Sequence, residues 1–403
     1  MNRLLHKIYS VAMLGAVALA GASCTMIEDD MKDCPTGLYV RFVYDYNTVR
    51  ADLFKDHVGH VTLYVYDEAG NMVARKSVSN SDGDSPLSSY GYSIHFAEGE
   101  LRPGKYRLQA VAMKKDWDDA LGAAGAKYRR TEPDRAEDLT ITLDHASTAD
   151  PATGLHSVEH RGAPLDTLWH TLKVMSYEPT DGTAVPDIHV SKAPYSIYPV
   201  EEQYVTVEAN RATHSTVSLI RDTKHLNITL RQLELPANVN HSDYEVTITD
   251  NNAAVGHDNS LLPGNDLLYT PFASWTTKFS ADGVETEDTR STRDGDGGAE
   301  IQRTAHFNVM FNRLMHHDDH DRCATLRIRN VKTGKDVATI NLPYILAQGR
   351  TAYELYNYSP QEYLDREYDY HLDFILKGDT WAYCEVVINV LSWSKRIQNE
   401  EFN

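Results

Sequence analysis

Apolar and polar residues alternate at every second position over much of the chain. Residues 38–44 and 60–66 both show this pattern, which is typical of β-strands because successive side chains point to opposite faces. The second run ends at a turn-forming cluster, residues 67–71, after which residues 72–77 continue the alternation. Two strands joined by a turn that contains Gly and Asn predict a β-hairpin.

A tight turn that leads directly into a strand is predicted at Pro103 and Gly104. Pro fixes φ for the first central position of such a turn, and Gly adopts the positive φ of the second. Tyr106, Leu108 and Ala110 then share one face of the following strand. This run, L-x-P-G-x-Y-x-L, resembles a strand start in transthyretin-like and collagen-adhesin B-type sandwiches.

The whole pattern predicts an all-β chain with two transthyretin-like, Ig-like antiparallel β-sandwich domains. Because regular patterning breaks over residues 180–199, we expect an N-terminal sandwich over 35–195 and a C-terminal one over 196–403. Helical periodicity is weak. Short helical turns are expected in three stretches, residues 215–224, 346–355 and 360–367.

The first 23 residues read as an export signal. Arg3 and Lys7 precede an apolar run, residues 8–20, and small residues lead to Cys24. A basic start, an apolar centre and a small-residue cleavage site define a secretory signal, and the Cys makes it resemble a bacterial lipoprotein signal. Cys24 is then the lipidated residue, and the signal peptide spans 1–23. Ordinary cleavage is the stronger rival, because Gly21 stands where lipoprotein signals usually have Leu; an uncleaved anchor is disfavoured because the run is short.

Residues 24–34 form an acidic tether between that Cys and the first strand. Its acidic residues Glu28, Asp29 and Asp30 resemble the surface-export signal of Bacteroidetes lipoproteins. The alternative is a solvated linker.

Net charge and cysteine content limit the classes of function that fit this chain. The formal charge of the 403-residue chain is −19, and loss of Arg3 and Lys7 with the signal makes it −21. Such a balance disfavours nucleic-acid binding, which needs a basic surface. Of the four cysteines, Cys24, Cys34, Cys323 and Cys384, the last two are either a disulfide or buried thiols, and the sequence leaves both open.

Catalytic chemistry finds no support in the sequence. No nucleophile elbow, zinc-protease motif or phosphate-binding loop is present, so we expect neither an enzyme nor a cofactor. The run 316–321 consists only of His and Asp, but consecutive residues splay apart, which favours a solvated loop over a metal site. Residues 294–298 resemble half a calcium loop but lack its closing Glu, since Ala305 stands there.

Several segments together resemble the FimB-type fimbrial anchor and minor-subunit lipoprotein family of the Bacteroidales. Their order along nearly the whole mature chain carries the resemblance: residues 33–40, 60–70, 103–106, 168–170, 219–224, 258–272, 311–315, 362–376 and 386–399. The resemblance implies a lipid-anchored outer-membrane protein at the base of type V pili, with fimbrial stalk pilins as partners. It also implies no enzymatic activity.

Two functions follow from this resemblance. In the first, the protein attaches the fimbria to the cell surface, limits its length, and donates a C-terminal strand to a pilin. The donor candidates are Ser394, Lys395, Arg396 and Ile397. The alternative is a surface or pilus-tip adhesin that binds glycans. An exposed aromatic platform would favour the alternative, and Trp117, Trp169 and Trp275 lie near loop-like stretches.

Overall fold

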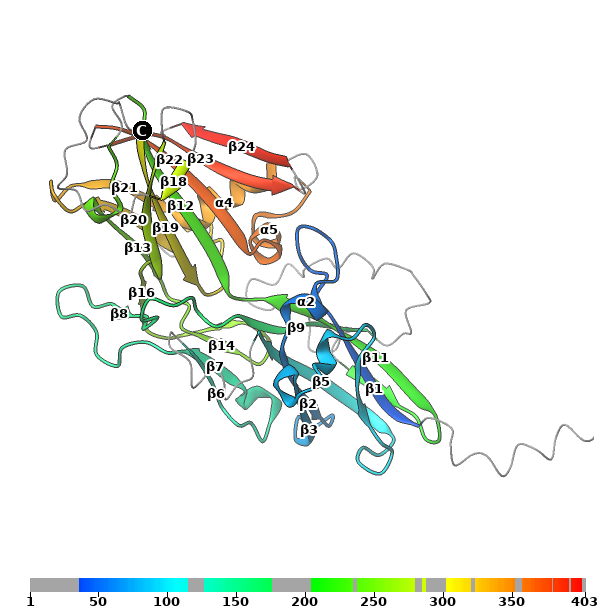
Figure 1. Ribbon diagram of the computed structural model, residues 1–403. Helices are drawn as coiled ribbons and strands as arrows, with labels where there is room; N and C mark the ends of the chain where they lie inside the picture. The colour runs from blue at the N-terminus through cyan, green and yellow to red at the C-terminus, as the bar shows by residue number, and fades with distance from the viewer. Residues whose placement is uncertain are drawn as a thin grey trace, which may run out of the picture.

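The computed structural model describes most of the chain between Thr36 and Glu400 (Figure 1). The described residues are 36–114, 127–175, 204–234, 238–279, 285–287, 302–319, 323–351, 357–378, 380–390 and 393–400.

The N-terminal half is built on a large sheet with the strand order β3-β2-β5-β9-β11-β1-β4, and β10 pairs with β5. Alternate side chains of these strands enclose one apolar core with Phe54 and Leu87, and Phe54 begins the single-turn helix α2 (Phe54–His57). The strands are β1 (Gly37–Val43), β2 (His60–Tyr66), β3 (Met72–Ser79), β4 (Ser93–Phe96), β5 (Gly104–Met113), β9 (Leu168–Met175), β10 (Tyr204–Val207) and β11 (Ala212–Arg221).

A smaller sheet covers the opposite face of β2 and β5. Tyr64, Tyr66 and Val111 point toward it and pack in one cluster with Ile141 and Leu143. All seven residues of β2 are therefore buried. The smaller sheet has the order β15-β14-β7-β6 and consists of β6 (Tyr128–Arg130), β7 (Thr140–Leu143), β14 (Ala254–Gly256) and β15 (Leu261–Leu262).

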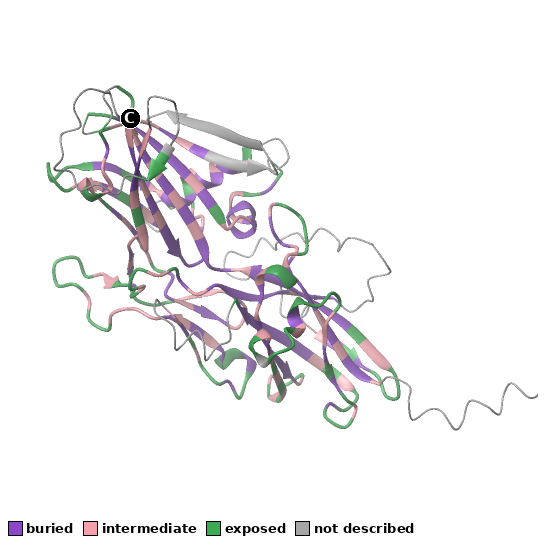
Figure 2. Ribbon diagram, viewed as in Figure 1, coloured by how far each residue is buried: buried purple, intermediate pink, exposed green. Residues whose placement is uncertain are grey.

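The C-terminal half is a sandwich of two sheets, with the orders β18-β17-β19-β12-β22-β23-β24 and β21-β20-β13-β16-β8. Figure 2 shows buried and less buried residues alternating along its central strands. The first sheet contains β12 (Lys224–Gln232), β17 (Ala273–Phe279), β18 (Glu285–Glu287), β19 (Gln302–Phe311), β22 (Asp369–Lys377), β23 (Thr380–Val390) and β24 (Trp393–Glu400). The second contains β8 (His156–Ser157), β13 (Tyr244–Asp250), β16 (Leu267–Tyr269), β20 (Thr325–Asn330) and β21 (Asp336–Asn341).

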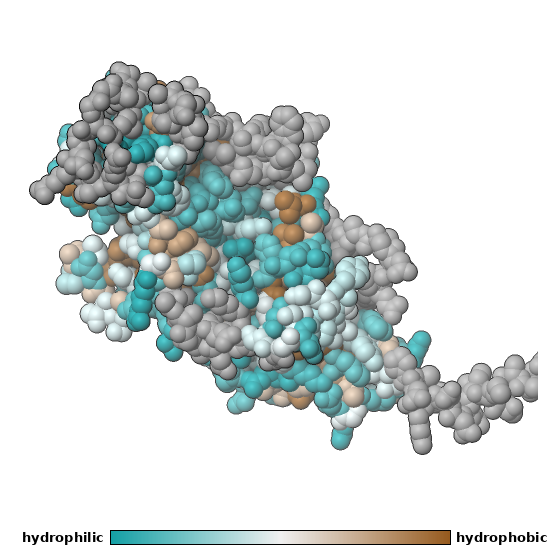
Figure 3. All heavy atoms as spheres, viewed as in Figure 1, coloured by the Kyte–Doolittle hydropathy of each residue, from teal (hydrophilic) through white to brown (hydrophobic). Residues whose placement is uncertain are grey.

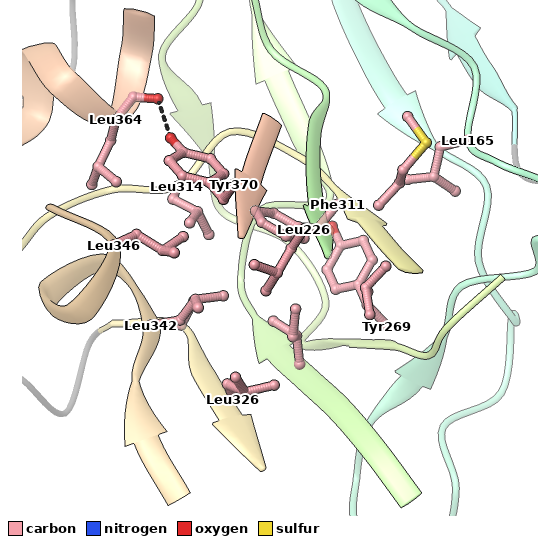
Figure 4. Packing of buried hydrophobic residues seen from close by; sticks show 14 of the residues in the cluster. Leu165, Leu226, Tyr269, Phe311, Leu314, Leu326, Leu342, Leu346, Leu364 and Tyr370 are labelled. Atoms are coloured by element: carbon pink, nitrogen blue, oxygen red, sulfur yellow. Dashed lines mark hydrogen bonds between the residues drawn. The ribbon is translucent and has the colours of Figure 1, made fainter. Parts of the chain in front are cut away.

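One core fills this sandwich and continues into the N-terminal half. Leu226, Leu326 and Phe311 pack between the sheets, and Leu165 from the N-terminal half joins the same cluster (Figure 4). Each fully buried side chain of this size contributes about 1.5–3 kcal/mol to folding. The helices α4 (Leu342–Ala347) and α5 (Pro360–Arg366) close one side of the core.

The two halves exchange strands. Strand β14 comes from the second half of the sequence but pairs with β7, and β8 comes from the first half but pairs with β16. The backbone amide of Leu143 donates to the Ala253 carbonyl at 2.9 Å, and that of His156 donates to the Asp266 carbonyl at 2.8 Å. Backbone hydrogen bonds therefore join the halves in addition to the chain itself.

The predicted all-β fold of antiparallel sandwiches is confirmed, and each large sheet also contains one parallel pair, β1 with β11 and β12 with β22. The boundary predicted at 195/196 separates strands that the sheet joins, since β10 and β11 pair with β5, β1 and β9. Strand pairing in the first sheet thus continues to Arg221.

The helix expected within residues 215–224 is wrong, because this stretch forms the end of β11 and the start of β12. The helix predicted over 360–367 is confirmed: Ser359 caps α5 by accepting a hydrogen bond from the Glu362 amide at 3.1 Å. Helix α4 begins at Leu342, four residues before the predicted 346–355, because Asn341 caps it and Pro343 follows.

Cys323 and Cys384 are free thiols, so they do not form the disulfide considered above. Cys384 is buried in the C-terminal core, and burial raises the pKa of its thiol. Cys34 lies outside the described residues.

Candidate functional site at the junction of the two sandwiches

The residues predicted to carry the anchor lie before the first described residue. Cys24, Glu28, Asp29 and Asp30 are outside the described residues, so their roles stay predictions. The chain enters the fold at Gly37, the first residue of β1.

Strand β1 is an interior strand, because β11 and β4 pair with its two sides. The Gly37 amide donates to the Arg211 carbonyl at 3.1 Å. Gly37 has a φ of +89°, and a Cβ there would lie 2.2 Å from the carbonyl oxygen of Phe96. Only Gly fits this position without moving the β4 backbone. The tether is therefore joined to a strand that neighbours hold on both sides.

The predicted donor residues Ser394, Lys395, Arg396 and Ile397 lie in β24. This strand pairs antiparallel with β23, with Val386 opposite Ile397 and Asn389 opposite Ser394. Strand β24 is at one edge of the seven-stranded sheet. The tail thus completes its own sheet in this structure, and its role as a donor stays a prediction.

Between these two ends, a buried ionic cluster joins the halves. Arg313 forms a two-pronged ion pair with Asp365 of α5, at 2.7 Å from Nε and 2.9 Å from Nη2. Its Nη1 donates to the carbonyl of Asn259 at 2.8 Å. All three residues are buried. Such paired geometry compensates for the removal of both charges from water.

Lys224 extends the cluster from the first residue of β12. Its Nζ donates to the carbonyls of Asp365 at 2.8 Å and Glu367 at 2.9 Å. Burial lowers the pKa of Lys224 to about 7, although Asp365 and Asp222 oppose this effect. The lysine fixes the end of α5 against the start of β12.

Asp222 connects the cluster to the N-terminal sheet. It accepts a hydrogen bond from Asn259 Nδ2 at 2.8 Å and contacts Nδ1 of His170 in β9. Next to it, Thr223 Oγ1 lies 2.9 Å from the hydroxyl of Tyr128. Polar contacts therefore run without a break from β9 to α5.

A second set of contacts links the loop after β1 to the end of α5 and the residues that follow it. The Arg366 guanidinium stacks 4.1 Å from the ring of Tyr46, and the Arg221 guanidinium lies 4.3 Å from the ring of Tyr368. Thr48 donates to the Glu367 carboxylate at 2.9 Å. The loop after β1 is thus fastened directly to the segment after α5.

This arrangement joins the two halves through buried polar contacts. Within the described ranges, no group of three or more His, Cys, Asp or Glu side chains can hold a metal ion, and the last two residues of the His/Asp run, 320 and 321, are outside those ranges. No helix among the described residues is long and apolar enough to cross a membrane.

The aromatic platform expected of a glycan-binding surface is not formed by Trp169, which is 1% exposed in the N-terminal core. Trp275 is half-buried and stacks on His306 at 5.2 Å. Trp117 lies outside the described residues.

Sequence reasoning missed the junction, although its residues lie in segments that carried the family resemblance, namely 219–224, 311–315 and 362–376. One signal was available. Arg313 and Asp365 each stand beside apolar residues that the pattern places in the core, and a charge in such a position needs a partner.

Taken together, these observations define an all-β chain built from two interlocked sandwiches. The chain belongs to the family described as fimbrillin-A associated anchor proteins Mfa1 and Mfa2, which it matches over residues 31–399. This confirms the resemblance to fimbrial anchor proteins. No curated protein matches the chain.

Two solved structures from Bacteroides thetaiotaomicron share the fold. A candidate polysaccharide-binding protein from Bacteroides thetaiotaomicron is 25% identical with a TM-score of 0.59, covering 90% of this chain and 99% of that one. A candidate adhesin from the same species is 24% identical with a TM-score of 0.61, covering 90% and 98%. The fimbrial anchor protein Mfa2 from Porphyromonas gingivalis is 14% identical with a TM-score of 0.49, covering 92% and 100%.

Proposed function

We propose that this protein attaches a fimbria to the outer membrane and limits the length of the fibre. Membership of the fimbrial anchor family over residues 31–399 is the observation that carries the proposal. The interlocked junction suits the task, because a pull between the tether and the far sandwich acts on backbone pairs, a shared core and buried ion pairs together.

In this proposal the lipid on Cys24 holds the membrane end, and Glu28, Asp29 and Asp30 direct export to the outer surface. A single acyl chain binds membranes only marginally, so stable anchoring needs more than one. Bacterial lipoproteins carry two or three, which meets this requirement. The other end of the protein then contacts the stalk pilins.

A second candidate function is a surface or pilus-tip adhesin. It is favoured by the candidate polysaccharide-binding protein that is 25% identical to this chain. The two functions put the protein at opposite ends of the fibre, so one fractionation distinguishes them.

Shearing fimbriae from cells tests the position. An anchor stays with the membrane fraction, and we expect more than about 90% of this protein there after complete shearing, with the stalk pilin in the supernatant. Recovery of most of the protein with the sheared fibres would contradict the anchor and support the tip adhesin. An unrelated outer-membrane protein that stays in the pellet serves as the control.

We further propose that the tail from Ser394 onward is donated to a pilin. β-strand addition gives affinity through main-chain hydrogen bonds and specificity through side-chain pockets. In the free chain β24 is an edge strand paired with β23, and a strand with one neighbour can be displaced without opening the core.

Deleting residues 394–403 is expected to release fimbriae from cells, raising the pilin in the medium at least tenfold. The truncated protein should still fold, with a single unfolding transition, because β23 keeps its pairing with β22. Immunoblots of medium and cells, with circular dichroism of the purified variant, measure both results. Fimbriae that stay attached to cells carrying the truncated protein would contradict the donor role.

A further inference from the structure

An open cavity of about 530 Å³ lies between the two sandwiches and is lined by residues of both. The N-terminal half contributes Lys114 after β5, the loop 163–167 before β9, and Arg221 at the end of β11. The C-terminal half contributes residues of β12, β19 and β22 and of the segments before β17 and β22. On the face shown in Figure 3, apolar surface also gathers between the sandwiches, on the side that carries β8. Clefts between domains commonly bind ligands.

The apolar part of the lining combines aliphatic side chains with two aromatic rings. Leu165 and Met310 are buried, the rings of Phe272 and Tyr368 are half-buried, and Pro164 is exposed. The apolar face of a ligand that packs on these side chains is removed from water, which favours binding.

Arg221 presents free hydrogen-bond donors to the cavity. Its Nε donates to the Thr223 carbonyl at 2.9 Å, and its guanidinium carbon lies 4.3 Å from the centre of the Tyr368 ring. No described residue accepts a hydrogen bond from its two terminal nitrogens, and neither nitrogen is buried. The guanidinium plane is thus held in place, while its fork can receive a planar anion such as a carboxylate.

Lys114 is the second cation of the lining. Its side chain is exposed, and it forms no ion pair or hydrogen bond with any residue that the structure describes. Burial lowers the pKa of His57, and the charges of Arg221 and Lys114 lower it further, with Asp56 opposing them. Both cations therefore lie near one imidazole.

Two carboxylates, Asp166 and Asp369, also line the cavity, so its charges balance overall. Asp369 is 46% exposed. Its Oδ1 lies 2.8 Å from His225 Nδ1 and accepts from Asn227 Nδ2 at 3.1 Å, whereas its Oδ2 is accessible and has no partner among the described residues. Burial raises the pKa of Asp369, but the hydrogen bond with His225 and the charge of Arg221 outweigh this and lower it. The Oδ2 atom is therefore an ionised acceptor.

Free donors, a free acceptor and apolar rings together define the kind of ligand. Its carboxylate would face Arg221 and Lys114, and a hydroxyl would donate to Asp369 Oδ2. Its apolar ring face would pack on the aromatic side chains. A hexuronic acid carries all three features on one ring. An acidic side chain of a protein supplies the carboxylate alone and brings it close to Asp369, which repels it.

We propose that this cavity binds a hexuronic acid residue of a polysaccharide, with Arg221 and Lys114 receiving its carboxylate and Asp369 accepting from a ring hydroxyl. The ligand would contact both halves of the protein, since the two cations belong to one half and Asp369 to the other. The proposal goes beyond attachment of the fimbria, and it does not depend on which end of the fibre the protein occupies.

The test uses methyl β-D-glucuronide as the probe and the intact protein, purified in detergent. Saturation-transfer difference NMR measures its dissociation constant, which we expect near about 1 mM for a ligand of this size. Methyl β-D-glucoside keeps the ring but lacks the carboxylate, and it should bind about tenfold more weakly. Raising NaCl from about 50 mM to about 500 mM should weaken binding of the glucuronide alone, because salt screens the charged contacts.

Lys114→Met removes a cation that no described residue contacts through a polar group, so it should fold normally and lower the affinity for the glucuronide about threefold to fivefold. The matched control is Lys332→Met, which removes an exposed lysine paired with Asp243 in the C-terminal sandwich and should leave binding unchanged. Arg221→Lys keeps the charge but loses the fork, and about tenfold weaker binding is expected. Thermal unfolding of each variant shows whether it folds.

Equal affinity for the glucuronide and the glucoside would overturn the proposal, and so would wild-type affinity in Lys114→Met or Arg221→Lys. N-acetyl-glutamate methylamide tests a protein as the source of the carboxylate: tighter binding of this compound than of the glucuronide would replace the polysaccharide with an acidic side chain of a partner protein. None of these results depends on where sheared cells retain the protein, so failure of the cavity and failure of the anchor function remain separable.

Discussion

Replacing Arg313 with Met is expected to lower the free energy of unfolding by about 3–5 kcal/mol, the usual cost of removing one partner of a buried ion pair. Asp365 would keep its charge in the core of the junction and lose both hydrogen bonds from Arg313, leaving the Gln361 amide at 3.1 Å and the nearby Lys224 to compensate for it. The carbonyl of Asn259 would lose its donor as well. Urea denaturation followed by circular dichroism measures the change.

Arg327→Met is the matched control for this substitution. Arg327 pairs with Asp336 at 2.8 Å, but both side chains are 44% exposed, so the loss should stay below about 1 kcal/mol. The double variant Arg313→Met/Asp365→Leu leaves no unpaired charge and should regain most of the loss. A cost below about 1 kcal/mol for Arg313→Met alone would contradict the view that this pair holds the halves together.

Loss of Arg313 should also weaken the neighbouring contacts of the junction. Lys224 Nζ donates to the carbonyl of Asp365, the residue that Arg313 holds, so loss of Arg313 also loosens the contact between α5 and β12. Amides around Asp222 should then exchange with solvent faster, because local opening requires less free energy. Under tension the junction, where a shared core and exchanged strands join the halves, should then open at a lower force than in the wild type.

The sequence predicted a strand correctly where a local signal, such as a turn motif or period-2 alternation, was present. The turn signal at Pro103 and Gly104 predicted the strand after it, and β5 begins at Gly104. The positive φ predicted for Gly104 is wrong, because this residue already has the backbone conformation of the strand. The run 215–220 was harder because all six residues are buried, which removes the period-2 signal. Its strand state depends on β1 and β9, which lie far away in the sequence.

The junction was beyond sequence reasoning for a similar reason. Arg313 and Asp365 are 52 residues apart, and Lys224 and Asp365 are 141 apart. No local pattern pairs charges over such distances. The pairing of β12 with β19 and β22 in one sheet brings their segments together. The membrane end is the reverse case: the prediction for Cys24 rests on a short linear signal alone, and this residue lies outside the described residues.

Cys24→Ala is expected to abolish lipid attachment, because the thiol is the only proposed site of acylation. Incorporation of radiolabelled palmitate should fall to background, and the protein should move from the membrane fraction to the soluble fraction or the medium. Fimbriae should leave the cells with it, since neither the interlocked junction nor the tail provides another hold on the membrane.

Replacing Glu28, Asp29 and Asp30 with Ala is the matched variant, because it changes the same tether and keeps Cys24. Palmitate incorporation should be normal, while the protein on intact cells should become resistant to added protease, as it no longer reaches the outer surface. Persistent labelling of Cys24→Ala would contradict the lipoprotein signal, whose departure at Gly21 makes ordinary cleavage the competing outcome. If protease still digests the triple Ala variant on intact cells, the acidic residues are not an export signal and the tether is a solvated linker. Cys24→Ala tests attachment to the membrane, and the triple Ala variant tests export to the outer surface. Together they distinguish the role of the lipid from that of the acidic residues after it.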